Sequence, residues 1–131
     1  MSTTSRVDIT DVVREEELLP LPAAAMYILT VLATGPKHGY ALMAEIRELS
    51  GGAVRLGPGT LYGSLKRMIG QGLIVEAGER PDPSLDDERR RYYELTEFGG
   101  KVFAAEHDRL TALVKVGRSR VSTWPAPGAA T

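Results

Sequence analysis

A short amphipathic segment enclosed by glycines, residues 57–72, constrains the fold of this 131-residue chain more than any other feature. Gly57, Pro58 and Gly59 come first. Because proline lacks a backbone N–H and glycine loses much freedom in a helix, we expect the helix to start after them, with Thr60 as N-cap. Gly70 and Gly72 are expected to end it. At about 100° per residue, one face of this helix is apolar and comprises Leu61, Leu65, Met68 and Ile69.

The opposite face is expected to carry small and basic side chains. It comprises Thr60, Gly63, Ser64 and Arg67, with Tyr62 and Lys66 at its boundary. Such a face could enter a DNA major groove, but it also fits an ordinary amphipathic helix with a solvated face. The helix alone does not decide between these two interpretations.

Two β-prone runs follow this helix, residues 73–77 and residues 90–95, joined by a polar loop. A hairpin directly after such a helix is typical of the wing of a winged helix-turn-helix. We expect Arg89, Arg90 and Arg91, on the returning strand, to contact DNA phosphates, although arginines at this place can also enter a minor groove. The alternative is a solvated charge cluster, because acidic residues 86–88 immediately precede these arginines.

Three motifs occur in order: HGYAL at residues 38–42, GTLYGSLKR at residues 59–67 and RYYELTEFG at residues 91–99. Together they resemble the motifs of the PadR family of bacterial transcriptional regulators. The resemblance extends over about residues 21–117, although Gly63 stands where the family often has proline. It implies a winged-helix DNA-binding domain, a packing and capping role for His38, a homodimer formed by the last helix, and a small-molecule effector bound between protomers.

The last helix is expected to start at the cap Thr96 and to reach about Val116. Its apolar residues are Phe98, Val102, Phe103, Leu110, Leu113 and Val114. This set is too rich for a helix at the end of a small domain, and an exposed apolar patch of this kind usually marks a partner surface. We therefore predict a dimer interface here; the alternative is packing on the first helix of the same chain.

The expected fold is mainly α with a small β-hairpin, a winged helix-turn-helix followed by a C-terminal dimerisation helix. We divide the chain into residues 1–20, an N-terminal arm or short helix, residues 21–95, the DNA-binding domain, residues 96–117, the dimerisation helix, and residues 118–131, a disordered tail. Within the DNA-binding domain, one helix is expected to follow Pro22 and a second to cover about residues 39–49.

Composition narrows the functional class. The chain has no cysteine and two histidines, and no histidine–carboxylate cluster has the spacing of a metal site. No serine has a neighbouring base, so we expect neither an enzyme nor a bound metal or cofactor. No apolar run reaches the roughly 18 residues of a membrane span, and no signal pattern is present, which favours a cytoplasmic protein.

These observations lead to a functional hypothesis. We expect a sequence-specific DNA-binding regulator of transcription, a repressor that acts as a homodimer on an inverted-repeat operator in double-stranded DNA. Release by a small-molecule inducer is an additional hypothesis. Two alternatives stay open: a winged-helix protein-interaction module without DNA binding, and a protein whose main function is ligand binding in the dimer cavity.

Overall fold

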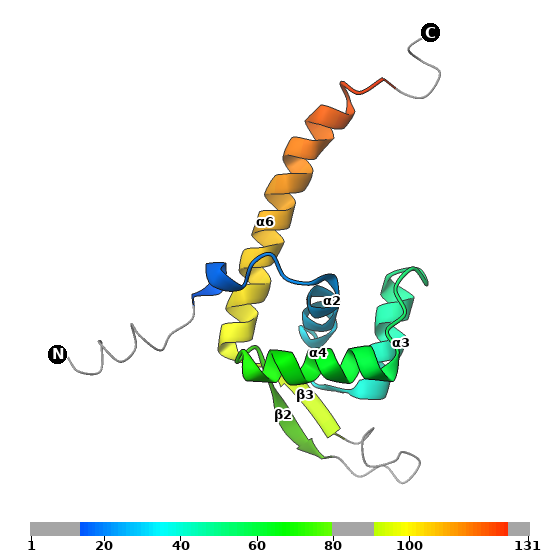
Figure 1. The fold of residues 1–131 in the computed structure, drawn as a ribbon, viewed down its shortest axis with the longest axis vertical. Coiled ribbons are helices and arrows are strands. Elements are labelled where there is room, and N and C mark those ends of the chain that lie inside the picture. Colours follow the sequence, from blue (N-terminus) through cyan, green and yellow to red (C-terminus); the bar gives the residue numbers. More distant parts are fainter. Residues whose placement is uncertain (1–13, 80–90, 126–131) are drawn as a thin grey trace, which may run out of the picture.

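The computed structural model describes residues 14–79 and 91–125, which form a small helical domain with one long projecting helix (Figure 1). The predicted fold class, mainly α with a small antiparallel sheet, is confirmed. In chain order the elements are η1 (Glu15–Leu18), α2 (Ala23–Leu32), β1 (Lys37–His38), α3 (Gly39–Leu49), α4 (Pro58–Gly70), β2 (Ile74–Glu79), β3 (Arg91–Leu95) and α6 (Glu97–Val121).

Helix α2 lies at the centre of the domain and contacts α3, α4, α6 and β3. Its Ile28 and Leu29 are fully buried. The other helices and the sheet add aliphatic side chains from the expected apolar faces, among them Leu42, Ile46, Leu61, Leu65, Leu73 and Val102. One hydrophobic core therefore holds α2, α3, α4, the sheet and the first half of α6 together.

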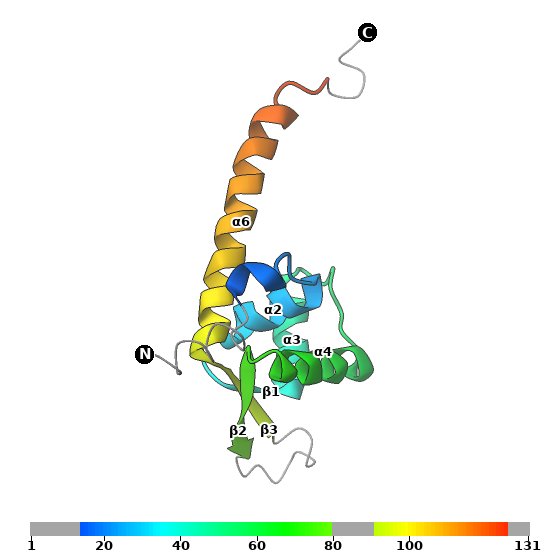
Figure 2. The same cartoon turned by 60° about the vertical axis from the view of Figure 1, so that its left-hand side comes forward.

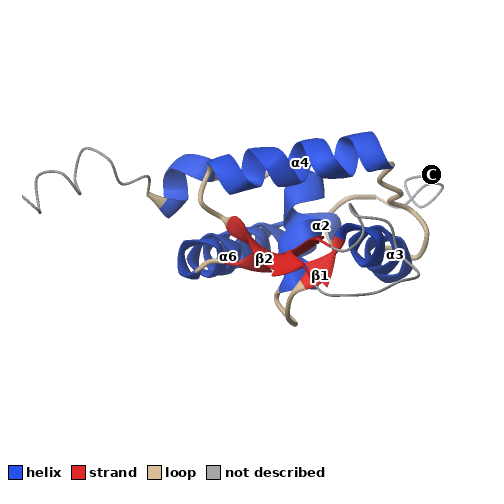
Figure 3. Cartoon of the chain, turned by 90° about the horizontal axis from the view of Figure 1, so that it is seen from below, coloured by secondary structure: helices blue, strands red, loops and turns tan. Residues whose placement is uncertain are grey.

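The sheet has three antiparallel strands in the order β1–β3–β2 and lies beside α4 when the domain is seen from below (Figure 3). The sequence pattern did not predict β1, in which Lys37 pairs with Tyr93 and His38 with Tyr92. Two residues, a lysine and a histidine, carry no alternating apolar pattern, so only the tertiary pairing with β3 makes this segment a strand.

Residues of the HGYAL motif contact residues of both other motifs. The Nδ1 atom of His38 accepts a hydrogen bond of 3.1 Å from the backbone N–H of Ala41 and so caps α3, as the resemblance implied. The His38 ring meets the ring of Tyr92 edge-on at 5.2 Å. A Cβ atom at Gly39 would lie 2.2 Å from the hydroxyl oxygen of Tyr62, so glycine there lets α3 and α4 approach closely.

The RYYELTEFG motif anchors α6 to the turn after α4. The Thr96 hydroxyl accepts a 2.8 Å hydrogen bond from the Gly99 N–H and donates to the Gly72 carbonyl at 2.6 Å. A Cβ atom at Gly99 would lie 1.9 Å from the carbonyl oxygen of Leu73. The threonine therefore caps α6, as predicted, and the glycine three residues later allows the helix to touch the backbone of this turn.

Two predicted helix boundaries differ from the structure. Helix α4 begins at Pro58 with Gly57 as N-cap, because the first turn of a helix needs no N–H donor and tolerates proline; Thr60 lies inside the helix and does not cap it. Helix α6 continues to Val121, beyond the expected end at residue 117. Between residues 14 and 20 the chain forms only the short 3-10 turn η1; residues 1–13 and 126–131 lie outside the described part.

None of the helices in residues 14–79 and 91–125 is long and apolar enough to cross a membrane.

Candidate nucleic-acid interface

Helix α4 presents an exposed face with two cations. Thr60, Gly63, Lys66 and Arg67 are exposed, whereas Leu61, Leu65 and Met68 are buried in the core. Apart from the lysine and the arginine, the side chains of this face are small. The helix surface is therefore positively charged and free of bulk along the side that points away from the domain.

Ser64 does not belong to this face, because its side chain is only 5 % exposed. It lies three residues after Leu61 and four before Met68, so at about 100° per residue it falls on the edge of the buried face. Ile69, expected on the apolar face, is 37 % exposed instead. Because Ser64 is buried, it is no longer a candidate contact residue. Its small side chain lets the helix pack closely along this edge.

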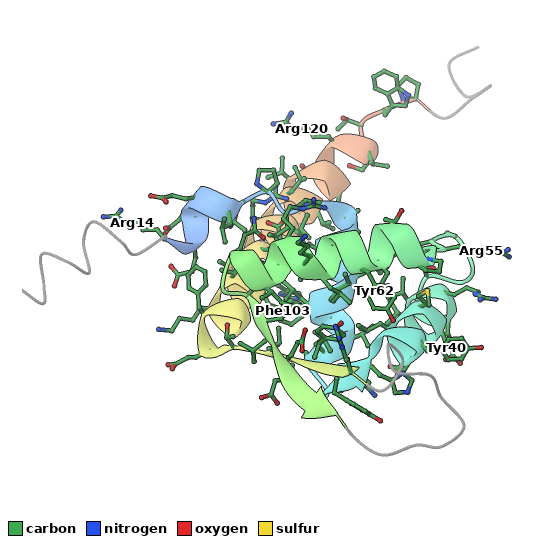
Figure 4. The ribbon with its side chains drawn as sticks, turned by 60° about the horizontal axis from the view of Figure 1, so that its bottom comes forward. Arg14, Tyr40, Arg55, Tyr62, Phe103 and Arg120 are labelled. Carbon is green, nitrogen blue, oxygen red and sulfur yellow. The ribbon has the colours of Figure 1, made fainter. Side chains whose placement is uncertain are left out.

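Tyr62 lies at the boundary between the buried and exposed sides of α4. Its side chain is half-buried beneath the helix, where its hydroxyl end reaches Gly39 of α3 (Figure 4). One side of the tyrosine also lines the groove between α4 and the hairpin. The packing of Tyr62 therefore sets the spacing of α3 and α4. Only the side of the tyrosine that lines the groove can contact a ligand.

A groove of about 310 Å³ separates α4 from the β2–β3 hairpin. Its apolar wall comprises Tyr62, Leu65, Ile69 and Tyr93, and its charged groups are those of Lys66, Glu76 and Arg91. The helix and the hairpin thus form the two sides of one surface, and each side contributes a cation to it.

Of the three arginines predicted to contact phosphate, the structure describes Arg91. It is exposed on β3 and lines the groove. Arg89 and Arg90 lie outside the described residues, as does the rest of the loop between the strands. The structure therefore brings one hairpin arginine together with Lys66 of α4.

Two further exposed side chains lie near the start of α4 and were given no role by the sequence. Arg55 is exposed in the segment before α4, and Tyr40 is 50 % exposed in the first turn of α3 (Figure 4). Arginine in a loop carries no helical or strand pattern, which is why periodicity could not select it. Position within the HGYAL motif was the only available signal for Tyr40.

The predicted interface residues on α6 divide into two groups. Val102 is fully buried within the chain, and Phe98 and Phe103 pack against the same core. Val102 is thus removed from the predicted interface, because the first half of α6 covers its own domain, as the alternative interpretation had it. Leu113 and Val114 remain 59 % and 55 % exposed.

The second half of α6 projects away from the domain (Figures 1 and 2). The helix face that carries the buried Gly99 and Glu106 continues along this half with steps of three or four residues, through Leu110, Val114, Gly117 and Val121. A shallow apolar hollow lies over Val114, Gly117 and Val121. The stripe is therefore covered by the domain in the first half of α6 and exposed in the second half.

A family model described as "Transcriptional regulator PadR-like family" matches residues 28–105. The chain belongs to this family. The match begins in α2, contains all three motifs and ends in the first half of α6, so it comprises the α4–hairpin surface described above. The protein is a transcriptional regulator of the PadR type, and the family consists of regulators rather than enzymes.

Known proteins similar to this chain include a transposon-encoded protein and a solved PadR family regulator. An uncharacterised 37.1 kDa protein of a transposon from Streptomyces fradiae is 39 % identical over 90 residues, which are 69 % of this chain but only 24 % of that protein's length. A PadR family transcription regulator from Clostridium difficile is 25 % identical with a TM-score of 0.63, over 76 % of this chain and 99 % of that one.

Bacillus subtilis PadR, solved in complex with operator DNA, shares the fold. Its TM-score is 0.55 at 24 % identity, over 70 % of this PadR-like chain and 48 % of the Bacillus chain.

Proposed function

We propose that this PadR-family protein binds a specific DNA sequence as a homodimer, with α4 as the recognition helix. The observation that carries the proposal is the exposed face of α4, on which Lys66 and Arg67 stand among small residues beside a hairpin that contributes Arg91. A helix of this kind fits the major groove of B-DNA, which admits one α-helix.

The side chains of α4 have different proposed roles. Arg67 and Lys66 contact guanine edges or phosphates, since both act as donors to the acceptors of guanine. Thr60 contacts the nearby backbone, and Gly63 allows the helix surface to approach the base edges. Tyr62 contributes a contact only from its groove side.

The hairpin supplies the non-specific part of the affinity. Arg91 binds phosphate from the wing, and Arg89 and Arg90 extend this contact as predicted from the sequence. Arg55 and Tyr40 flank the start of the recognition helix and are additional candidates for backbone contacts. Bacillus subtilis PadR, which has the same fold, was solved in complex with operator DNA, and this supports DNA binding by the fold.

The open half of the α6 stripe is the proposed dimer interface. Leu110, Val114, Gly117 and Val121 repeat at the spacing of helices that pack side by side, and Leu113 lies next to them. A two-fold dimer presents two recognition helices about one DNA turn, ~34 Å, apart, so the operator is an inverted repeat. The dimer represses transcription, in the cytoplasm, by occupying a promoter, and a small-molecule inducer would release it.

The test is selection of duplexes from a random pool by the purified chain, followed by competition binding at two salt concentrations. We expect an inverted repeat to be enriched and log affinity to fall steeply with log salt, by about 0.9 per neutralised phosphate. A flat salt dependence without any enriched sequence would instead favour the protein-interaction module.

A further inference from the structure

The groove between α4 and the hairpin contains a carboxylate. Glu76 on β2 is exposed and lines this groove together with Lys66 of α4 and Arg91 of β3. Strand register explains the placement: Glu76 pairs with Tyr93, so both residues lie on the sheet face that looks toward α4. Arg91, two residues before Tyr93, lies on the same face.

A carboxylate at this place acts against phosphate binding. Lys66 and Arg91 attract the DNA backbone, whereas Glu76 repels any phosphate within a Debye length, about 10 Å at 0.1 M salt. Non-specific complexes derive essentially all of their affinity from phosphate contacts. Glu76 therefore weakens those complexes in which the groove contacts only the DNA backbone.

The Glu76 carboxylate has a different effect on the operator complex. When α4 is seated against base edges, a carboxylate beside it can accept a hydrogen bond from the amino group of cytosine, which offsets the repulsion. A backbone-only complex offers no such donor. Since the two complexes differ in this respect, Glu76 affects their affinities unequally.

We propose that Glu76 is a specificity-determining residue, which lowers affinity for non-operator DNA more than affinity for the operator. This inference rests on the proposed function. It concerns a residue of the hairpin rather than of the recognition helix. The groove would then help to distinguish operator from non-operator DNA, in addition to supplying cationic contacts.

The chain offers a matched control on the same hairpin. Glu94 follows Tyr93 on β3 and pairs with Val75, so it lies on the opposite face of the sheet. It is not among the residues that line the groove. Replacing either glutamate by glutamine removes one negative charge from the hairpin, but only Glu76→Gln removes it from the groove.

The experiment measures fluorescence anisotropy of two labelled duplexes, the sequence selected by the wild-type chain and a scrambled duplex of equal length and composition. We expect Glu76→Gln to tighten scrambled-duplex binding roughly fivefold at low salt, as for unit charges a few ångströms apart in water. Operator affinity should change less, so the ratio of the two affinities falls. Glu76→Lys should lower the ratio further.

Glu94→Gln should leave the ratio at its wild-type value. The inference is overturned if Glu76→Gln leaves the ratio unchanged or if Glu94→Gln lowers it equally. Circular dichroism and the thermal midpoint verify folding, which an exposed side chain should not affect. If the wild-type chain itself binds neither duplex in a salt-dependent manner, it is the proposed function that fails.

Discussion

The carboxylate of Glu106 on α6 accepts a 2.9 Å hydrogen bond from the backbone N–H of Leu21, 85 positions earlier in the chain. Glu106 is only 2 % exposed, and the Arg109 guanidinium donates to it from the next turn of α6, with Nη2 at 2.9 Å. The contact ties the projecting helix to the segment that enters α2. It therefore helps to set the direction of the proposed dimerisation helix relative to the DNA-binding domain.

This contact predicts a loss of stability in acid. The hydrogen bond from Arg109 and, secondly, the one from Leu21 lower the pKa of Glu106 below its ordinary value of about 4.5, although burial opposes them. A depressed pKa stabilises the fold above the unfolded pKa, and this contribution disappears as the pH falls through the folded one. Glu106→Gln, which keeps an acceptor but cannot titrate, should lose less stability than wild type below about pH 4.5.

The control for this prediction is Glu106→Ala, which removes the acceptor altogether. It leaves the Leu21 N–H without its partner and should lower the free energy of unfolding by about 1–3 kcal/mol at neutral pH. Urea denaturation at neutral and acidic pH measures both variants. Equal acid sensitivity of wild type and Glu106→Gln would show that this carboxylate does not contribute to the pH dependence.

Two adjacent glycines of α6 are predicted to respond in opposite ways to alanine. At Gly99 the new Cβ would lie 1.9 Å from the Leu73 carbonyl oxygen, a backbone atom that cannot move without displacing the turn after α4. At Gly100 nothing lies within 4 Å of the new Cβ. Gly99→Ala should therefore destabilise the domain by about 1–3 kcal/mol through overpacking. Gly100→Ala should stabilise it by up to about 1 kcal/mol, because alanine is the better helix former.

Thermal unfolding of these two variants under identical conditions decides the point. Destabilisation of both by a similar amount would mean that glycine is needed along the whole first turn of α6, rather than only where it touches Leu73.

Ser64 and Arg67 are predicted to separate stability from DNA binding. Arg67→Ala should weaken operator binding by about 1–3 kcal/mol, as for loss of a base or phosphate contact, with little change in thermal midpoint because the side chain is exposed. Ser64→Ala should leave operator affinity near wild type, since that side chain is buried. Competition binding of both variants checks this. Comparable losses of affinity would return Ser64 to the DNA-contacting face.

Local chemistry was sufficient to predict the order of helices and hairpin, because caps and apolar periodicity act over a few residues. Thr96 could be placed as a cap for this reason, whereas the capping role of His38 was implied by the resemblance to the PadR family. The side of α4 on which Ser64 lies could not be read from polarity. Burial there follows from angular position and small size, and the packing of α4 on the core decides it.

Helix α6 shows a different limit of sequence analysis. Phe98, Val102 and Leu113 look alike as apolar residues of one amphipathic helix, but the first two contact the chain's own core and the third is exposed. The sequence pattern indicates that a helix face is apolar, but it does not indicate which part of the protein covers that face. The division between the covered and the open half depends on where the domain ends in space, which only the structure shows (Figure 2).

Two valines on the open half of α6 test the dimer interface. Val114 belongs to the apolar stripe, whereas Val116, two residues later, points to another side of the helix at about 100° per residue. Their exposed fractions are nearly equal, 55 % and 51 %. Val114→Asp should place a charge in the interface and shift the chain from dimer to monomer at micromolar concentration, because an unpaired buried charge is costly. Val116→Asp introduces the same charge at equal exposure and should leave the dimer intact.

Sedimentation velocity gives the mass of each variant, and circular dichroism checks that both remain helical. Operator binding should decrease only in Val114→Asp, the variant that loses the dimer, because a monomer can occupy just one half-site. A wild-type chain that sediments as a monomer would contradict the interface outright. Dissociation by Val116→Asp alone would place the partner on the other side of α6, away from the stripe that continues from Glu106.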